Sequence, residues 1–212
     1  MKNITITDKN ILIYRIIFTA LSWFTIVTGT IISTIENLSI LPWFNGFITF
    51  TMQTNLLVTI WLTLAILWHK KPQLLEKIRG VIKGAFTLYI TITFVFFAIL
   101  LSPIYQPTEL YPAFSNLVLH YITPIAFIVD WVLTETKIRY EWKYLGYWIT
   151  YPIGYLVFAF LHGTFTGNYI YFFLDIEQLG IMGYTLFITV LIISGLVLGS
   201  LYIAVNRKRI KI

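Results

Sequence analysis

Hydroxyl and amide side chains crowd the start of an otherwise apolar segment, FITFTMQTNLLVTIWL, at residues 47–62. Thr51 and Asn55 are four residues apart and Thr51 and Thr54 are three apart, so a helix places each pair on one face. A threonine hydroxyl is a weak nucleophile until a neighbouring base takes its proton, and histidine is the commonest base. Nucleophilic chemistry at this segment therefore requires a histidine from another element.

Of the three histidines in the chain, His120 lies inside a long apolar segment, NLVLHYITPIAFIVDW. An ionisable side chain in such a place indicates a functional site by default. His162 lies nearer the end of its apolar segment, so it is either a second functional residue or a wetted helix-end residue; His69, beside Lys70, fits the second description. The threonines and Asn55 have structural alternatives, because threonine commonly bonds the carbonyl four residues earlier and asparagine can join two membrane helices.

The elements that carry these residues are expected to be membrane helices. Of the 212 residues, 58% are hydrophobic and 11% are charged, and the mean hydropathy is +0.80, outside the range of soluble domains. A helix of about 20 residues crosses about 30 Å of hydrocarbon. The sequence therefore predicts an all-α, multi-pass protein of the cell membrane, with a single six-helix domain over residues 1–212. Its predicted spans are residues 13–34, 47–68, 81–101, 114–133, 146–164 and 181–204.

The basic residues indicate the orientation of these spans. All 15 Lys and Arg residues lie on alternate connections or within the first three residues of the span that follows: near the start of the first span, between the second and third, between the fourth and fifth, and in the C-terminal tail. The connections at 35–46, 102–113 and 165–180 carry acidic residues and no cation. By the positive-inside rule, both termini are expected in the cytoplasm and these three connections outside. The net charge of +6 is therefore a signal of topology and not of nucleic-acid binding.

This orientation predicts one level for the polar residues of three spans. The second and fourth spans run inward and the fifth runs outward, which puts Thr51, Asn55 and His120 near the outer surface. His162 reaches the same level from the fifth span, with Asp175 beyond it. We therefore expect these three spans to surround a pocket that opens toward the outer leaflet.

The inner half of the fourth span carries a carboxylate, Asp130, ten residues beyond His120. It lies about 15 Å deeper along a helix, too far to orient the imidazole. We expect Asp130 to pair with Lys137 or Arg139, or to reach water at the cytoplasmic boundary. Between the two, Pro124 lacks the amide hydrogen that would bond the carbonyl of His120, so we expect a kink or a cavity there.

Several kinds of chemistry are excluded by what the sequence lacks. It has no cysteine, and no G-x-S-x-G, H-E-x-x-H, P-loop or G-x-G-x-x-G motif. Its three histidines are spread over both sides of the membrane, which does not make a metal site. An enzyme built on this sequence is therefore expected to need neither a metal nor a cofactor.

Four stretches together carry a resemblance: FTMQTNLLV at 50–58, LHYITPIAFIVDW at 119–131, YPIGY at 151–155, and HGTFTGNYIYFFLD at 162–175 with Gly180 after it. In this order, across most of the chain, they resemble the prokaryotic six-transmembrane-helix family, which is related to the eukaryotic androgen-induced and androgen-dependent membrane proteins. The family typically has YPYPFLD where this chain has YIYFFLD, so the connection here lacks both prolines.

The resemblance implies a chemistry. The eukaryotic relatives are multipass hydrolases that use a threonine nucleophile and a histidine to cleave branched fatty-acid esters of hydroxy fatty acids. By motif, Thr51 is the implied nucleophile and His120 its base, with Thr49 and Thr54 as alternatives to Thr51. The implied partners are membrane lipids and a fatty-acid ester substrate.

The oxyanion formed in such a reaction needs hydrogen-bond donors in a low-dielectric site. We expect Asn55, or the wet groups near His162 and Tyr169, to supply them. The expected substrate-binding residues are Asn55, Thr54, His162, Tyr169 and Asp175. The alternatives are a six-helix transporter or substrate-binding membrane subunit without catalysis, whose polar residues contact a solute, and a structural or regulatory membrane protein.

Overall fold

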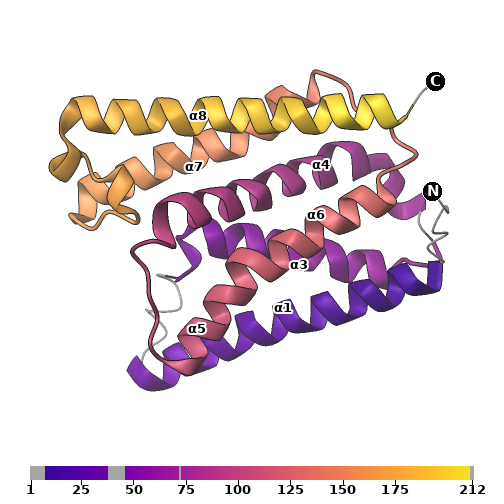
Figure 1. Cartoon of the computed structure of the whole chain (residues 1–212), viewed down its shortest axis with the longest axis horizontal. Helices are drawn as coiled ribbons and strands as arrows, with labels where there is room; N and C mark the ends of the chain where they lie inside the picture. The colour runs from indigo at the N-terminus through magenta and orange to yellow at the C-terminus, as the bar shows by residue number, and fades with distance from the viewer. Residues whose placement is uncertain (1–7, 38–45, 72, 211–212) are drawn as a thin grey trace. The chain divides into compact units, whose positions relative to one another are not determined.

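The computed structural model describes residues 8–37, 46–71 and 73–210. These residues form helices and no strand, which confirms the all-α prediction (Figure 1). The elements are α1 (Asp8–Asn37), α3 (Phe50–Leu67), α4 (Gln73–Phe96), η1 (Phe97–Leu101), α5 (Leu110–Leu117), η2 (Val118–Ile122), α6 (Thr123–Thr134), α7 (Tyr144–Thr166), η3 (Phe172–Leu174) and α8 (Ile176–Arg209).

Six helical segments of this described part are long and apolar enough to cross a membrane, as the sequence predicts. They are Asp8–Asn37, Phe50–Leu67, Gly80–Leu101, Leu110–Thr134, Tyr144–Thr166 and Ile176–Arg209. The first and last are longer than predicted, because the helix continues through polar and charged ends that an apolar run does not include. The predicted connection at 35–46 falls largely on residues 38–45, which lie outside the described residues.

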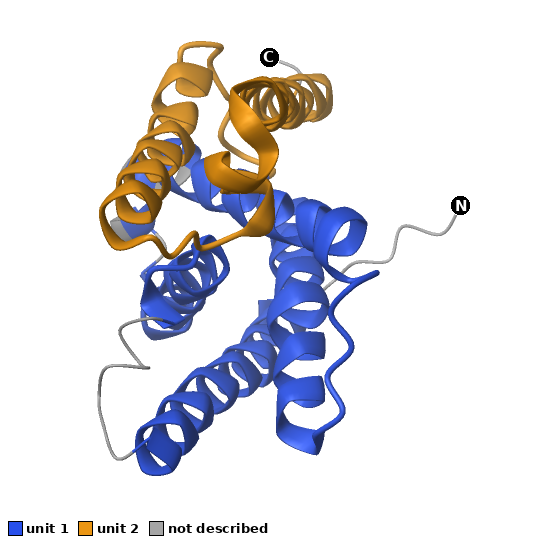
Figure 2. Ribbon diagram, turned by 90° about the vertical axis from the view of Figure 1, so that its left-hand side faces the viewer, with its two compact units in different colours: residues 1–135 blue, residues 136–212 orange. Residues whose placement is uncertain are grey.

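The chain divides into two compact units, residues 1–135 and 136–212 (Figure 2). In unit 1, successive helices run in opposite directions: α1 packs on α3, α3 on α4, and α4 on α6. The α6 helix also contacts α1, which closes a four-helix bundle. The fourth member is a composite of α5, η2 and α6. The core of unit 1 is apolar and comprises Val58, Trp61, Leu62, Ala65, Leu75, Ile90 and Phe127.

Polar side chains also join the helices of unit 1. The Trp23 indole donates to the Thr63 hydroxyl at 3.0 Å, and the Ser22 and Thr123 hydroxyls lie 2.8 Å apart. Lipid tails are as apolar as leucine, so membrane helices associate through close packing and such hydrogen bonds more than through hydrophobic burial. The part of α1 that carries Ser22 and Trp23 is therefore a packing surface.

In unit 2, α7 and α8 pack against each other, and η3 packs against α8. The α7 helix ends at Gly167, whose φ of 71° is a left-handed conformation that glycine adopts without strain. The α8 helix begins with Asp175 as its cap: the carboxylate accepts from the Gln178 amide at 3.0 Å. A second positive φ, 66° at Gly180, interrupts α8 one turn further on.

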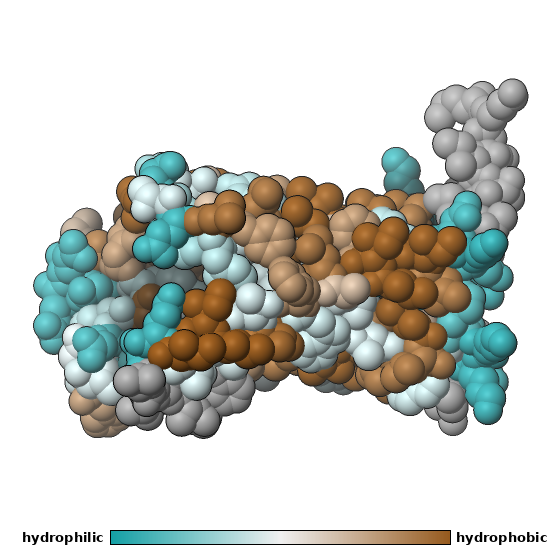
Figure 3. All heavy atoms as spheres, turned by 90° about the horizontal axis from the view of Figure 1, so that it is seen from below, coloured by the Kyte–Doolittle hydropathy of each residue, from teal (hydrophilic) through white to brown (hydrophobic). Residues whose placement is uncertain are grey.

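Large apolar side chains cover the outward faces of these helices. On α1 the exposed ones are Ile13, Ile16, Ile17, Phe24, Val27, Ile31 and Ile35, and on α8 they include Leu186, Val190, Ile193, Val197 and Leu201. On the face drawn in Figure 3, hydrophobic residues occupy the middle and hydrophilic residues gather toward both ends. In a soluble protein such a surface would aggregate, whereas a bilayer covers it.

Candidate functional site

Two of the three candidate threonines at the start of α3 have hydroxyls with structural partners. Thr49 caps the helix: its hydroxyl donates to the Gly46 carbonyl at 2.8 Å and accepts from the Met52 amide at 3.2 Å. Thr54 is fully buried, and its hydroxyl lies 2.8 Å from that of Thr93 on α4. Both side chains therefore hold the backbone or a neighbouring helix in place.

Thr51 differs from both. Its hydroxyl makes no hydrogen bond with any described residue, and the side chain is half-buried. It is the second residue of α3, beside the positive end of the helix dipole, which favours negative charge nearby. Of the three threonines, Thr51 has the hydroxyl that is available to react.

Asn55 joins α3 to the composite helix of α5, η2 and α6, which contains His120 and which we call the rod. Its amide nitrogen donates to two carbonyls, those of Thr51 and Leu119, each at 2.9 Å. Because both partners are carbonyl oxygens, which only accept, the orientation of the amide is fixed and both of its hydrogens are used. The predicted role of Asn55 as an oxyanion donor stays a prediction, and in this geometry it would require one of these two bonds to be given up. Its Oδ1 is buried without a hydrogen-bond partner.

The Leu119 carbonyl is available to Asn55 because the helix widens at this point. The η2 segment is a π turn, in which the Thr123 amide bonds the Val118 carbonyl instead of that of Leu119. The next residue, Pro124, has no amide hydrogen to offer. The change in the helix expected at this proline thus takes the form of a wide turn that leaves one carbonyl for a side chain.

His120 lies in this π turn and is held from two sides. Its ring stacks on Phe97, the first residue of the η1 π turn, with centroids 3.6 Å apart and planes at 18°. Its Nδ1 lies 3.1 Å from the Asn116 carbonyl. A carbonyl only accepts, so this bond requires the hydrogen on Nδ1 and leaves the lone pair on Nε2. Nε2 has no hydrogen-bond partner among the described residues, so this tautomer can act as a base.

We call Thr51, Asn55, Asn116 and His120 the His120 layer. The Asn55 amide lies within hydrogen-bond distance of both the Thr51 and the Leu119 backbone, so the start of α3 and the π turn occupy one level, as the sequence predicts. No hydrogen bond joins Thr51 to His120 in the described part of the chain. That the two side chains face each other stays a prediction.

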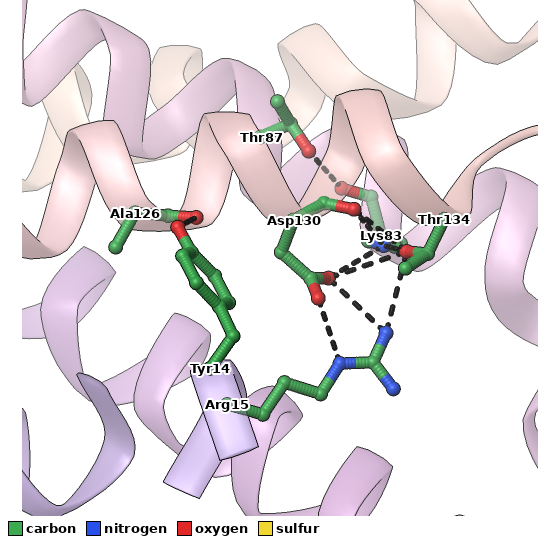
Figure 4. Close-up of polar contacts among 7 residues, drawn as sticks. All are labelled: Tyr14, Arg15, Lys83, Thr87, Ala126, Asp130 and Thr134. Carbon is green, nitrogen blue, oxygen red and sulfur yellow. Dashed lines mark hydrogen bonds and ion pairs between the residues drawn. The ribbon is translucent and has the colours of Figure 1, made fainter. Parts of the chain in front are cut away.

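A second polar group, which we call the Asp130 cluster, lies at the other end of unit 1 (Figure 4). The carboxylate of Asp130 is fully buried between two cations: Arg15 Nε is 2.7 Å from Oδ1, and Lys83 Nζ is 2.7 Å from Oδ2. The Thr134 hydroxyl bonds both cations and the Asp130 carbonyl. The expectation that Asp130 pairs with Lys137 or Arg139 is therefore wrong.

The pattern of basic residues places Arg15 and Lys83 on connections. Both lie instead within helices, on faces turned to α6. The spacing of the polar residues that follow each cation indicates that the cation faces the protein interior. Arg15 is in helical register with Thr19 and Ser22, and all three are buried. Lys83 is in register with Thr87 and Thr91, whose hydroxyls bond carbonyls one turn earlier. A polar stripe on a membrane helix faces the protein interior, so a cation in that stripe does too.

The remaining predicted residues lie in unit 2, where they organise the segment between α7 and α8. His162 is half-buried, with Nδ1 3.0 Å from the Asn168 carbonyl. The Tyr169 ring fills the space beside Gly163, where a Cβ would lie 2.2 Å from it. Asp175 caps α8. Their predicted approach to Thr51 and His120, which belong to unit 1, stays a prediction.

No family model, no curated protein and no solved structure matches the chain. Its class therefore follows from its helices alone. It is a multi-pass integral membrane protein with six spans in the described residues.

Proposed function

We propose that this protein is a lipid-ester hydrolase of the prokaryotic six-transmembrane-helix family, with Thr51 as nucleophile and His120 as general base. One observation carries the proposal. At the level of the π turn, the Thr51 hydroxyl and the His120 Nε2 lack hydrogen-bond partners among the described residues, whereas the Thr49 and Thr54 hydroxyls and the Asn55 amide nitrogen are paired. Groups left unpaired in a tightly bonded setting are the ones free to engage a substrate.

In the first step, Thr51 Oγ attacks the ester carbonyl carbon while His120 Nε2 takes the hydroxyl proton. The tetrahedral intermediate collapses by breaking the bond to the alcohol oxygen, which leaves with the proton from Nε2. The Asn116 carbonyl accepts from Nδ1 and stabilises the imidazolium formed in between. The acyl group then remains on Thr51.

In the second step, water attacks the acyl-threonine carbon as Nε2 takes its proton. The carbon–Oγ bond breaks, Thr51 regains the proton from Nε2, and the carboxylic acid leaves. The negative charge on the carbonyl oxygen in both steps forms beside the N-terminus of α3, whose dipole stabilises it.

The proposal is tested by trapping the acyl-enzyme. Purified protein in detergent is treated with a fluorophosphonate probe and with long-chain p-nitrophenyl esters, and the modified residue is located by peptide mass spectrometry. We expect the adduct on Thr51, and no adduct in Thr51→Ala or His120→Ala protein. Thr49→Ala and Thr54→Ala are the matched controls, since their hydroxyls belong to the same two turns.

An adduct on Thr49 or Thr54 would move the nucleophile within the segment. Turnover that survives replacement of all three threonines would overturn the hydrolase mechanism. The six-helix transporter would then be the better account, and substrate binding that depends on residues from several helices would support it.

A further inference from the structure

The guanidinium of Arg15 has five N–H groups, and the Asp130 cluster uses only those on one edge. Nε donates to Asp130 Oδ1 at 2.7 Å, and Nη2 donates to Oδ2 and to the Thr134 hydroxyl, each at 3.3 Å. Nη1, with two N–H groups, has no partner among the described residues (Figure 4). Arg15 keeps 11% of its side-chain surface exposed, whereas Asp130 keeps none.

The described ion pairs of the cluster meet at one carboxylate, because Arg15 and Lys83 both bond Asp130. A buried cation is costly unless an opposite charge is near it. An anion at Nη1 would bring a second opposite charge to Arg15.

The cluster lies at the end of unit 1 where α1 and α4 begin and α6 ends. Arg15 is about 10 Å along α1 from Asp8, within reach of lipid headgroups for a long side chain. The exposed residues Lys9, Lys70 and Lys71 lie at the same end of the bundle. Their charge raises the local concentration of anions.

We propose that the Nη1 edge of Arg15 binds a phosphate group. The two Nη1 hydrogens donate to phosphate oxygens, while Asp130 holds the other edge of the guanidinium and fixes its plane. Because the side chain is already ordered, binding costs little additional conformational entropy. The phosphate comes either from a phospholipid headgroup at the membrane boundary or from free phosphate, since both present the same oxygens.

The test compares anions on the full chain. Purified protein is placed in nanodiscs of phosphatidylcholine, of phosphatidylcholine with phosphatidylglycerol, and of phosphatidylcholine with added inorganic phosphate. The thermal unfolding midpoint is measured in each, and lipid retained after extraction is counted by native mass spectrometry. Arg15→Lys keeps the charge but removes the second edge, and Lys9→Gln removes an exposed charge at the same end of the bundle.

We expect phosphatidylglycerol to raise the unfolding midpoint of the wild-type protein, and Arg15→Lys to weaken its retention about tenfold. Lys9→Gln should retain it almost as the wild type does. A matching effect of inorganic phosphate in neutral nanodiscs would assign the site to free phosphate instead of lipid. Equal retention by wild type and Arg15→Lys would overturn the proposal.

If Arg15→Lys does not fold, the site can be tested on the wild-type protein. Arginine side-chain NMR then follows the Nη signals of Arg15 as phosphatidylglycerol or inorganic phosphate is added. A shift confined to this arginine is the expected result, and unchanged signals with both anions would reject the site.

Discussion

The His120 layer and the Asp130 cluster lie at different levels of the rod formed by α5, η2 and α6, and they differ in how their polar groups are paired. In the Asp130 cluster, the carboxylate receives two cations and a hydroxyl, and each oxygen is engaged. In the His120 layer, the Thr51 hydroxyl, His120 Nε2 and Asn55 Oδ1 have no described partner. The same helices thus carry one group whose carboxylate is fully paired and one whose hydroxyl, imidazole nitrogen and amide oxygen are not.

The difference separates two meanings of a polar residue in a membrane. Burying a charge or an amide is costly, so a membrane protein pairs such groups wherever they serve only structure. Groups left unpaired in the same bundle are therefore informative. The comparison predicts that changes in the Asp130 cluster alter stability most, and that removing the Thr51 hydroxyl or the His120 imidazole alters activity most.

The largest effect is expected from Thr51→Ala and His120→Ala, which should each lower ester turnover by about 10³-fold or more. The double variant should be scarcely slower than either one, because the two residues act as a unit. Thr51→Ala should leave the free energy of unfolding within about 0.5 kcal/mol of the wild type, since the Thr51 hydroxyl bonds no described residue. His120→Ala should also lower stability, because the ring stacked on Phe97 is lost. Turnover of p-nitrophenyl esters measures the activity, and unfolding in detergent measures the stability. Thr51→Ser, which keeps a hydroxyl, should retain part of the activity.

Asp130→Asn should lower the free energy of unfolding by about 3–5 kcal/mol, because Arg15 and Lys83 are left buried without their counter-charge. Unfolding by denaturant in mixed micelles measures this. The control is Glu141→Gln, whose carboxylate bonds Lys143 at 2.8 Å with both side chains more than half exposed. That change should have no measurable effect on stability. Wild-type stability of Asp130→Asn would contradict a cohesive role for the cluster.

A smaller loss is expected for Asn55→Leu, about 1–3 kcal/mol, because the carbonyls of Thr51 and Leu119 lose their shared donor. The same unfolding assay applies. Asn37→Ala is a suitable comparison, since the Asn37 amide is exposed and bonds only the Ser33 carbonyl of its own helix. If Asn55→Leu proved as stable as Asn37→Ala, the amide would not be holding α3 to the π turn.

The smallest expected change tests whether Thr54 is a structural residue and not the reactive one. Thr54→Val keeps the shape of the side chain and removes its bond to Thr93, at a cost of about 1 kcal/mol. Ester turnover should be unchanged. Thr93→Val should cost a similar amount, and the double variant little more than either, as a double-mutant cycle would show. A loss of turnover in Thr54→Val alone would assign the reactive hydroxyl to Thr54.

The sequence predicts the helices and the common level of Asn55 and the His120 segment. Spans follow from the length of apolar runs, and the common level of Asn55 and the His120 segment follows from the rise per residue. The partners of Asp130 were missed because Arg15 and Lys83 were counted as charges on connections. The stacking of His120 on Phe97 was missed as well, since it depends on two π turns that apolar periodicity does not reveal.

The π turn before Pro124 also sets the rotational phase of the rod. Adding one residue to a regular helix turns everything beyond it by about 100°. A π turn contains the extra residue within a single turn, so the directions of the helical faces before and after it are set separately. His120 can thus meet Phe97 while Asp130, on the same rod, points between Arg15 and Lys83. A chain one residue shorter here would have a straighter helix, able to satisfy one of these two contacts and not both.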